Sequence, residues 1–290
     1  MKSRLARLPG QLALLATTVL AGGILAGALL RVSPGFGADE RELDPRLNEA
    51  SRQSIRADRM ANRDLFHFYV RYFGSVLHGD LGTSESLQRP IAELIRYRAP
   101  VTAGLMATGI VGGWVLAFAV AIPAVLCRRR FWTGSIGLLT GVLICVPSAV
   151  LAILVFNLGG PVRGIVALVI FPRVFDYLRN LLQDAYAQPH ILTARAKGLG
   201  TGRILLRHVL PAAAPQLLAL AGVSATMAFG AAIPVETLCD LPGLGQLAWK
   251  AALARDLPVL VVLTAIITLA TQLCNSVSDW MGGNGEAGRI

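Results

Sequence analysis

The sequence predicts an all-α membrane protein with six transmembrane helices. Of its 290 residues, 54% are hydrophobic and only 15% are charged, a balance outside the usage of ordinary soluble domains. Several apolar runs also reach the roughly 20 residues that a helix needs to cross a bilayer. These runs are too long for barrel strands, and the ten-residue alternation typical of membrane barrels is absent from the sequence. Helical spans are therefore the prediction.

Apolar runs with few or no charges place the six spans. Five of them are clear, at about 11–30, 101–127, 131–158, 209–235 and 258–277. The sixth, at about 161–182, is weaker because Arg173, Asp176 and Arg179 interrupt it. A spacing of three residues puts these charges on one stripe of a helix. Two interpretations stay open: the stripe faces a water-filled interior, or the helix projects beyond the bilayer and the charges are solvated.

Two of the runs need further comment. The first follows Lys2, Arg4 and Arg7 and could be a secretory signal. Its apolar part is about 20 residues long, whereas the apolar core of a signal has 7–15, so a retained helix is predicted. The third run contains Pro147, which predicts a kink that either serves as a hinge or is simply accommodated by the neighbouring helices.

The distribution of Lys and Arg predicts the orientation. Basic residues gather at the amino terminus, in the turn at 128–130 and in the loop 183–207, and by the positive-inside rule this side is cytoplasmic. Both termini are then cytoplasmic. The net charge of +10 reports this topology, because no soluble basic domain or nucleic-acid-binding motif accompanies it. Nucleic acid is not an expected partner, whereas the lipid bilayer is.

The chain divides into three parts. Residues 1–98 hold the first helix and a long outer loop, with a short helix at about 44–60 and an amphipathic segment at 66–77 that suits the membrane interface. Residues 99–280 form the core of five helices. Residues 281–290 are a short cytoplasmic tail.

No pattern of catalytic or metal-binding residues is present. The four cysteines have no C-x-x-C spacing, and the four histidines form no cluster with metal-ligand spacing. The glycine-rich run at 198–202 lacks the Lys-Ser/Thr ending of a phosphate-binding loop. The sequence thus predicts no catalytic residue, no metal and no cofactor bound by this chain.

A basic loop at about 188–207 is the most informative segment. Residues 190–197 are mostly good helix formers, and Pro189 separates them from the helix before. Gly198 suits the left-handed position that closes a helix. A short helix across one end of the bundle is the prediction.

The side chains of this short helix leave two functions open. Ala194 and Ala196 would present little bulk to a partner protein, with Arg195 and Lys197 in the last turn, where the helix dipole favours cations. Alternatively, the segment is an ordinary positive-inside connector.

Several short motifs, in their order and spacing, resemble one family of permeases. Ala194 to Leu199 followed by His208 to Pro211 looks like the coupling (EAA) loop of ABC-importer permeases. The further matches are Gly79 to Ser84, Val146 to Ser148, Val235 to Thr237, Pro242 to Gly245, Ala254 to Pro258, and Asn275 with Asp279. Together they resemble the dipeptide, oligopeptide and nickel permeases, and the element at 79–84 with the long first outer loop is similar to the B-type subunit.

The resemblance implies a permease fold with a cytoplasmic coupling helix, in a bacterial cytoplasmic membrane. The residues that would contact the ATPase are Thr193, Ala194, Arg195, Ala196, Lys197, Gly198, Leu199, Leu210 and Pro211. The implied partners are a homologous C-type permease, two ATP-binding subunits that use ATP and Mg²⁺, and an extracytoplasmic solute-binding protein. The chain itself would not be an enzyme.

The loop between the last two spans suggests an outer gate. Its residues are Glu236, Pro242, Gly243, Leu244, Gly245, Arg255 and Asp256. A purely structural turn is the alternative.

Two departures from the family pattern bear on coupling. Gln188 to His190 replaces the usual acidic-aromatic pair, and Ala212 stands where Asn is common.

The function expected from the resemblance is that of an ATP-driven importer subunit for peptides, with nickel chelates or other small solutes as alternatives. A secondary transporter or channel without an ATPase is the rival interpretation, although repeated halves with broken helices are not evident. An intramembrane enzyme would need a reactive pair of side chains within the spans, and the sequence shows none.

Overall fold

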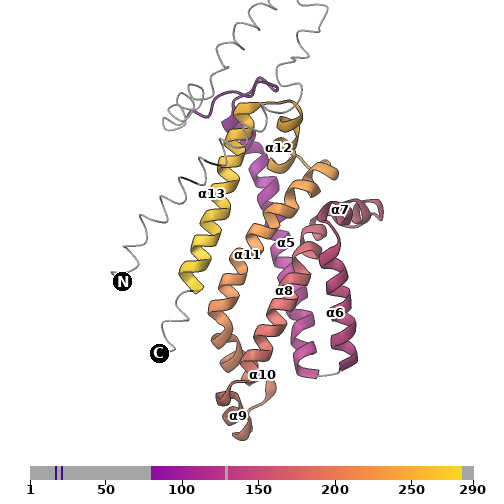
Figure 1. Ribbon diagram of the computed structural model, residues 1–290, viewed down its shortest axis with the longest axis vertical. Helices are drawn as coiled ribbons and strands as arrows, with labels where there is room; N and C mark the ends of the chain where they lie inside the picture. Colours follow the sequence, from indigo (N-terminus) through magenta and orange to yellow (C-terminus); the bar gives the residue numbers. More distant parts are fainter. Residues whose placement is uncertain (1–16, 18–20, 22–79, 128–129, 283–290) are drawn as a thin grey trace, which may run out of the picture. The chain divides into compact units, whose positions relative to one another are not determined.

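The computed structural model describes residues 17, 21, 80–127 and 130–282, and the described chain is helical (Figure 1). An isolated β-bridge, Thr83 with Pro90, is the only strand-like pairing in this part. The helices are α5 (Ile91–Cys127), α6 (Arg130–Cys145), α7 (Ser148–Asn157), α8 (Val162–Tyr186), α9 (Pro189–Ala196), α10 (Thr201–Ile204), the π-helix η2 (Leu205–Val209), α11 (Leu210–Leu238), α12 (Leu244–Leu253) and α13 (Leu257–Gly282).

The helices belong to two compact units. One contains Met1–Tyr97 and Leu247–Leu269, and the other contains Arg98–Gln246 and Ala270–Ile290. The second unit includes α6 to α11 and thus much of the segment 99–280 that the sequence predicts as the core of the permease.

Three helices among the described residues are long and apolar enough to cross a membrane: Ile91–Leu126, Thr201–Leu238 and Leu257–Ser276. The bent pair α6 and α7 would make a fourth if it counts as one span. α8 has the length of a span, but its charged residues set it apart from these helices. The predicted first span at 11–30, the helix at 44–60 and the interfacial segment at 66–77 lie outside the described residues, apart from Thr17 and Ala21.

The third predicted span, 131–158, is not a single helix. The chain bends by 103° between Cys145 and Ser148, so α6 and α7 point in different directions. Pro147 precedes the first residue of α7 with φ −58° and ψ 141°, outside the helical region. The break follows from proline chemistry, because the ring removes a backbone donor and disfavours helical backbone in the residue before it.

The basic loop is shorter than the predicted 188–207. Only Lys197 to Gly200 separate α9 from α10, and from Thr201 the chain is helical through to Leu238. Within this stretch the N–H of Leu210 donates to the carbonyl of Leu205, five residues back, which is the π-helical turn η2. Pro211 comes next and has no N–H to donate. The π turn therefore lies between the helix start at Gly200 and Pro211, which interrupts the i to i−4 hydrogen bonds of an α-helix.

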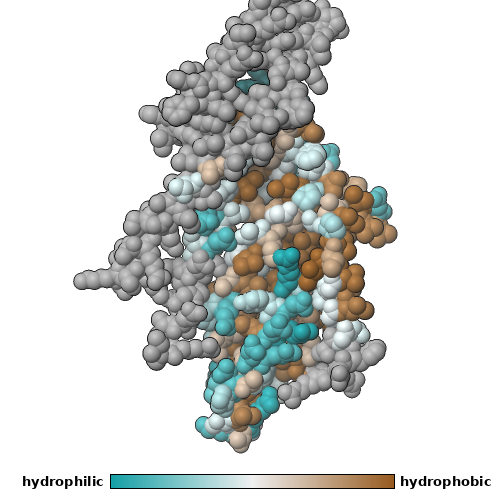
Figure 2. Space-filling view, in the orientation of Figure 1, coloured by the Kyte–Doolittle hydropathy of each residue, from teal (hydrophilic) through white to brown (hydrophobic). Residues whose placement is uncertain are grey.

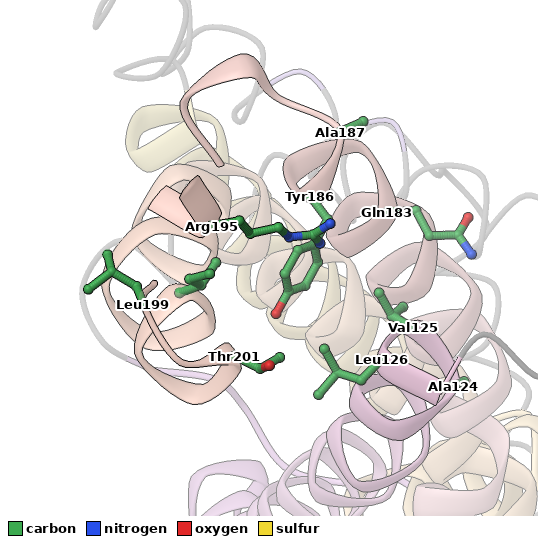
Figure 3. A pocket seen from close by; sticks show the side chains of 10 residues that line it. Ala124, Val125, Leu126, Gln183, Tyr186, Ala187, Arg195, Leu199 and Thr201 are labelled. Atoms are coloured by element: carbon green, nitrogen blue, oxygen red, sulfur yellow. The ribbon is translucent and has the colours of Figure 1, made fainter. Parts of the chain in front are cut away.

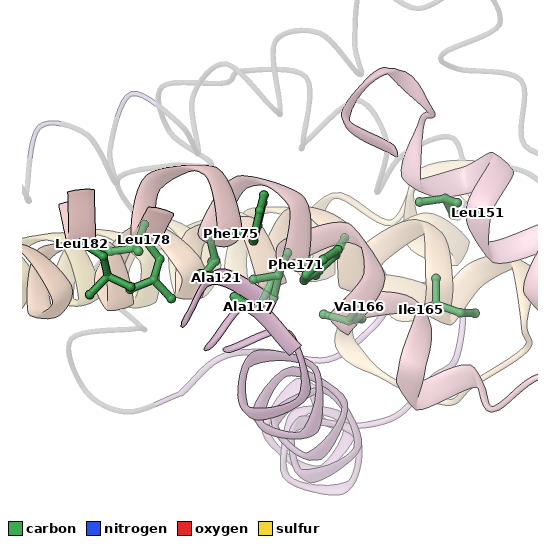
Figure 4. Close-up of a cluster of buried hydrophobic side chains, with 14 of the residues drawn as sticks. Ala117, Ala121, Leu151, Ile165, Val166, Phe171, Phe175, Leu178 and Leu182 are labelled. Atoms are coloured by element: carbon green, nitrogen blue, oxygen red, sulfur yellow. The ribbon is translucent and has the colours of Figure 1, made fainter. Parts of the chain in front are cut away.

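α8 supplies the centre of the core of the second unit. Its inward side chains include Ile165, Val166, Ile170, Phe175 and Leu178, all of them almost completely buried. Figure 4 shows α8 side chains directed towards the small residues Ala117 and Ala121 of α5. Small residues on one helix let a second helix approach closely, which is the usual way that membrane helices pack.

Two glycines of α5 make this approach very close. A Cβ on Gly109 would overlap the side chain of Val166, and a Cβ on Gly113 would lie 3.1 Å from Ile170 and 3.2 Å from the carbonyl oxygen of Ala167. α5 and α8 consequently touch at a level where any larger residue on α5 would push them apart.

Candidate functional site

α9 follows α8 after only Ala187 and Gln188, at the position where the sequence predicts the short helix. Gln188 is extended, Pro189 occupies the first helical turn, and the helix ends at Ala196. Proline is well suited to the first turn because the N–H that it lacks would have no partner there. Ile191 is fully buried and Ala194 is 4% exposed, so these two residues fix α9 against its own bundle.

The burial of Ala194 corrects one part of the prediction. Ala194 and Ala196 are two residues apart, so they cannot share one face of a helix. Ala194 faces the core of its own chain, whereas Thr193, Arg195, Ala196 and Lys197 are exposed. Of the two alanines, only Ala196 is therefore on the exposed face of α9.

Gly198 ends α9 in the left-handed conformation that the sequence predicts, with φ +71°. Its N–H donates to the carbonyl of Arg195 at 2.9 Å, and the N–H of Leu199 donates to the carbonyl of Ala194 at 3.3 Å. This pair of bonds is the Schellman motif, which satisfies two carbonyls at the helix end. The conformation sets the direction in which the chain leaves α9.

The exposed surface around this turn is strongly basic. Its exposed cations, on α9, on α10 and on the segments that follow each of them, are Arg195, Lys197, Arg203 and Arg207. Leu210 packs on the hydrophobic core, while Pro211 is exposed at the start of α11. The predicted coupling residues are thus brought to one end of the unit, with their cations on its surface.

A cavity of about 860 Å³ opens beside α9, between the ends of α5 and α8 and the start of α10. Figure 3 shows the ring of Tyr186 among Arg195, Thr201 and Leu126. The guanidinium carbon of Arg195 lies 5.8 Å from the centroid of that ring, within the range of a cation–π interaction. The Tyr186 hydroxyl is buried and has no hydrogen-bond partner within the described part of the chain. Burial raises the pKa of Tyr186, and the nearby charge of Arg195 opposes this effect.

The loop after α11 is organised by one buried carboxylate. Glu236 is completely buried, and its Oε2 accepts the N–H of Gly245 at 2.7 Å and the N–H of Gln246 at 3.3 Å. These are N–H groups of the first turn of α12, which have no partners inside the helix. Glu236 therefore caps α12 from a distance, and its negative charge suits the positive end of the helix dipole.

Gly243 and Gly245 make room for this carboxylate. A Cβ on Gly243 would overlap the Glu236 carboxylate, and one on Gly245 would lie 2.7 Å from the Cα of Ile233. The N–H of Leu244, between them, donates to the Thr102 hydroxyl at 2.8 Å. The predicted gate residues Glu236, Gly243, Leu244 and Gly245 are thus one packed cluster, with Pro242 exposed at its edge.

The other two predicted gate residues, Arg255 and Asp256, belong to the other compact unit. Asp256 is 1% exposed. Its Oδ2 accepts the hydroxyl of Ser84 at 2.5 Å and both the N–H and hydroxyl of Ser86, at 2.9 Å and 2.7 Å. Its Oδ1 accepts the N–H of Val259, in the first turn of α13, at 3.4 Å. Asp256 thus joins the start of α13 to the segment around Ser84, while Arg255 before it adopts φ 55°.

Some residues of these clusters could not be identified as site residues from the sequence. Thr102 and Ser86 are single polar residues in ordinary contexts, and only the fold brings them to Leu244 and Asp256. Asn275, which belongs to the predicted motifs, accepts a hydrogen bond from the Thr226 hydroxyl at 3.0 Å. The described residues contain no group of three or more His, Cys, Asp or Glu that could hold a metal ion.

Comparison with known proteins places this arrangement among transport permeases. The oligopeptide transport system permease protein AppB of Bacillus subtilis is 28% identical over 88% of this chain and 90% of its own length. OppB, the oligopeptide permease of Escherichia coli K12, is 29% identical over 82% and 84%. The glutathione transport system permease protein GsiC of Salmonella typhimurium is 26% identical over 90% and 91%.

A solved structure and a family model agree with these relatives. The inward-facing MetNI methionine ABC transporter contains a chain of similar fold, with a TM-score of 0.51, 17% identity, and coverage of 64% of this chain and 97% of that one. The family described as "Binding-protein-dependent transport system inner membrane component" matches residues 95–286, which include α6 to α13 and all but the start of α5. The chain belongs to this family of inner membrane transport components.

Proposed function

We propose that this chain is one of two permease subunits of an ATP-driven importer of peptides. It pairs with a homologous C-type permease, and two ATP-binding subunits that use ATP and Mg²⁺ drive the pair. An extracytoplasmic solute-binding protein delivers the substrate. The oligopeptide and glutathione permeases among its relatives support this assignment and favour peptides over nickel chelates.

The observation that carries the proposal is the construction of α9 and its turn. Ile191 and Ala194 seat α9 on the bundle, and the left-handed Gly198 fixes how the chain leaves it. Arg195, Ala196 and Lys197 stay exposed. A helix with one face packed on its own bundle and the opposite face exposed can transmit the movement of a docked partner to that bundle. In this proposal α9 is the coupling helix, seated on one ATP-binding subunit.

The same proposal gives an orientation. α9 and both termini lie in the cytoplasm of a bacterial cell, and the chain crosses the inner membrane six times, with α6 and α7 forming one bent span. Support comes from the cations around α9, because Lys and Arg are enriched in cytoplasmic loops. The Glu236 and Asp256 clusters are then at the outer side, where they set the shape of the loops that meet the binding protein or gate the path.

The test compares glycine variants in the turn after α9. Gly198→Val forces a β-branched residue to φ +71°, a strain of at least about 1 kcal/mol that tilts α9. Membrane insertion should be unchanged, while ATPase co-purification and ATP-dependent peptide uptake should both fall. Ala196→Asp should have the same effect, because it places an acid on the bare side of α9.

Gly202→Ala is the matched control. A Cβ at Gly202 meets no atom within 4 Å, and the residue lies in α10. If both Gly198→Val and Ala196→Asp retain full ATPase binding and full uptake, α9 is only a connecting segment and the coupling role is wrong. Uptake that survives a block of ATP hydrolysis while an ion gradient is intact would point instead to a secondary transporter.

A further inference from the structure

One face of α8 is polar and exposed along the middle and the second half of the helix. Arg173, Tyr177, Asn180 and Asp184 follow one another at intervals of four, three and four residues, so they lie on one stripe, here called the α8 stripe. All four are exposed, and Tyr177 is 49% exposed. The opposite side of the helix is the buried core described above.

The borders of the α8 stripe are also polar. Asp176 is partly buried, and its Oδ1 lies 3.5 Å from the hydroxyl of Thr140 on α6. Arg179 is partly buried as well, and its Nε is shielded from solvent without a hydrogen-bond partner among the described residues. A shielded guanidinium nitrogen of this kind calls for water or another polar group close by.

The α8 stripe begins at the depth of the apolar spans. Gly109 of α5 contacts Val166 and Gly113 contacts Ile170, so the two helices run in the same direction, and Arg173 lies near the level of Leu116. α5 carries no charged residue between Arg98 and Arg128. Leu116 is 11 residues before Cys127, which is about 16 Å along a helix. Arg173 is thus well inside the part of the bundle that hydrocarbon would surround.

Neighbouring surfaces at this depth are apolar. Leu138 of α6 is 73% exposed and Val142 is 54% exposed, as expected for side chains that face lipid. Figure 2 shows the contrast, with a hydrophilic band over α8 beside the hydrophobic surface of α6 and α7. An exposed guanidinium is very unfavourable in lipid, and ionisable residues in spans almost always face a protein interior or a water-filled cavity.

We infer that the α8 stripe lines the water-filled path by which the substrate crosses the membrane, at the face that this chain turns to the second permease. The inference rests on the proposed function and adds which residues of this chain line the path. The stripe offers one cation, Arg173, one carboxylate, Asp184, and the neutral hydrogen-bonding groups of Tyr177 and Asn180. That mixture suits a zwitterionic peptide, which carries an ammonium and a carboxylate and needs water or polar groups throughout.

Cysteine labelling of the intact permease–ATPase complex in membranes tests this inference. Tyr177→Cys and Asn180→Cys probe the α8 stripe, and Leu138→Cys and Val142→Cys on α6 are the matched lipid-facing controls. All are made in a chain whose four native cysteines are replaced by alanine. The probe is 2-(trimethylammonium)ethyl methanethiosulfonate, which reacts with hydrated thiolates. The α8 thiols should react at least about tenfold faster than the α6 thiols, because a thiol in an apolar medium stays protonated.

A second measurement separates a transport path from a helix end that is merely in water. Trapping the complex with ATP and vanadate changes which side of the path is open, so the labelling rates of Tyr177→Cys and Asn180→Cys should change several-fold while those of the α6 controls stay constant. Rates equal to those of the α6 controls would overturn the inference, and so would fast labelling that is the same in both states. In a preparation that retains its ATPase, either result leaves the proposed function standing, whereas loss of the ATPase from the wild-type complex would count against the proposed function itself.

Discussion

The carboxylate of Glu236 accepts the N–H of Gly245 at 2.7 Å, nine residues further along the chain, and so holds the start of α12 against the end of α11. The first-turn N–H groups of α12 have no acceptors inside the helix, and here an acceptor comes from the preceding helix. The loop between these helices is consequently defined by a side chain that precedes it.

Glu236→Ala should destabilise the protein more than Glu236→Gln. Alanine leaves the buried N–H groups of Gly245 and Gln246 without their acceptor, at about 1–3 kcal/mol. Glutamine keeps one acceptor oxygen. The measurement is the apparent melting temperature of the purified complex in detergent, with Glu93→Gln, an exposed acid in the first turn of α5, as the control. Equal melting temperatures for Glu236→Ala and wild type would show that the cap is unimportant.

Gly243→Ala should be harmful only while Glu236 is present. The new Cβ would overlap the Glu236 carboxylate, and Glu236→Ala removes that obstacle. The double variant should therefore be more stable than the sum of the single effects, by about 1 kcal/mol or more. Gly230→Ala, where a Cβ meets nothing within 4 Å, is the control. Strictly additive effects would contradict the contact.

Gly243→Val extends the same argument to transport. A larger side chain should displace the loop and reduce uptake, while α9 and the ATPase contact proposed for it stay intact. Uptake and ATPase co-purification are measured on the same membranes. Unchanged uptake would argue against any gating role for this loop.

Asp256→Ala should loosen the segment around Ser84. The variant removes the acceptor for three donors from Ser84 and Ser86. Amide hydrogen exchange in residues 82–90 should accelerate, and Asp256→Asn should fall between alanine and wild type because one oxygen remains. Exchange as slow as in wild type would mean that other contacts hold this segment.

Tyr186→Phe should be nearly neutral for stability or slightly favourable. The hydroxyl is buried and lacks a partner among the described residues, so its removal takes away a desolvation penalty and leaves the ring in place for Arg195. Thermal unfolding in detergent measures the effect. A loss above about 1 kcal/mol would reveal a hydrogen bond to a group outside the described residues.

Reporter tags test the proposed topology. Tags before Met1 and after Ile290 should report cytoplasm, and a tag near Glu49 should report the outer side. A tag on the opposite side from the one expected would remove the six-span arrangement.

The sequence predicts the helical class and most elements of the core because apolar periodicity and proline positions act locally. Pro189 and Gly198 bound α9 as expected, since both act through their own backbone torsions. The 103° bend at Pro147 was predicted only as a kink, because its size depends on how α7 packs. The inward position of Ala194 also depends on tertiary packing. The Ser84–Asp256 contact spans 172 residues, and no local pattern specifies such a distance.

The glycines that let α5 touch α8 also bear on how the protein moves. A Cβ added to Gly113 would lie only 3.2 Å from the Ala167 carbonyl oxygen, so the two helices pack closely and neither can slide past the other without a steric barrier. Only Ala187 and Gln188 separate α8 from α9, so under the proposed function a displacement of α9 would pass to the end of α8 and move α5 with it. Under the proposed function, α5 and α8 would move as one rigid pair, and bending during transport is expected where the helical hydrogen bonds are interrupted, as at Pro147 and at the π turn Leu205–Val209.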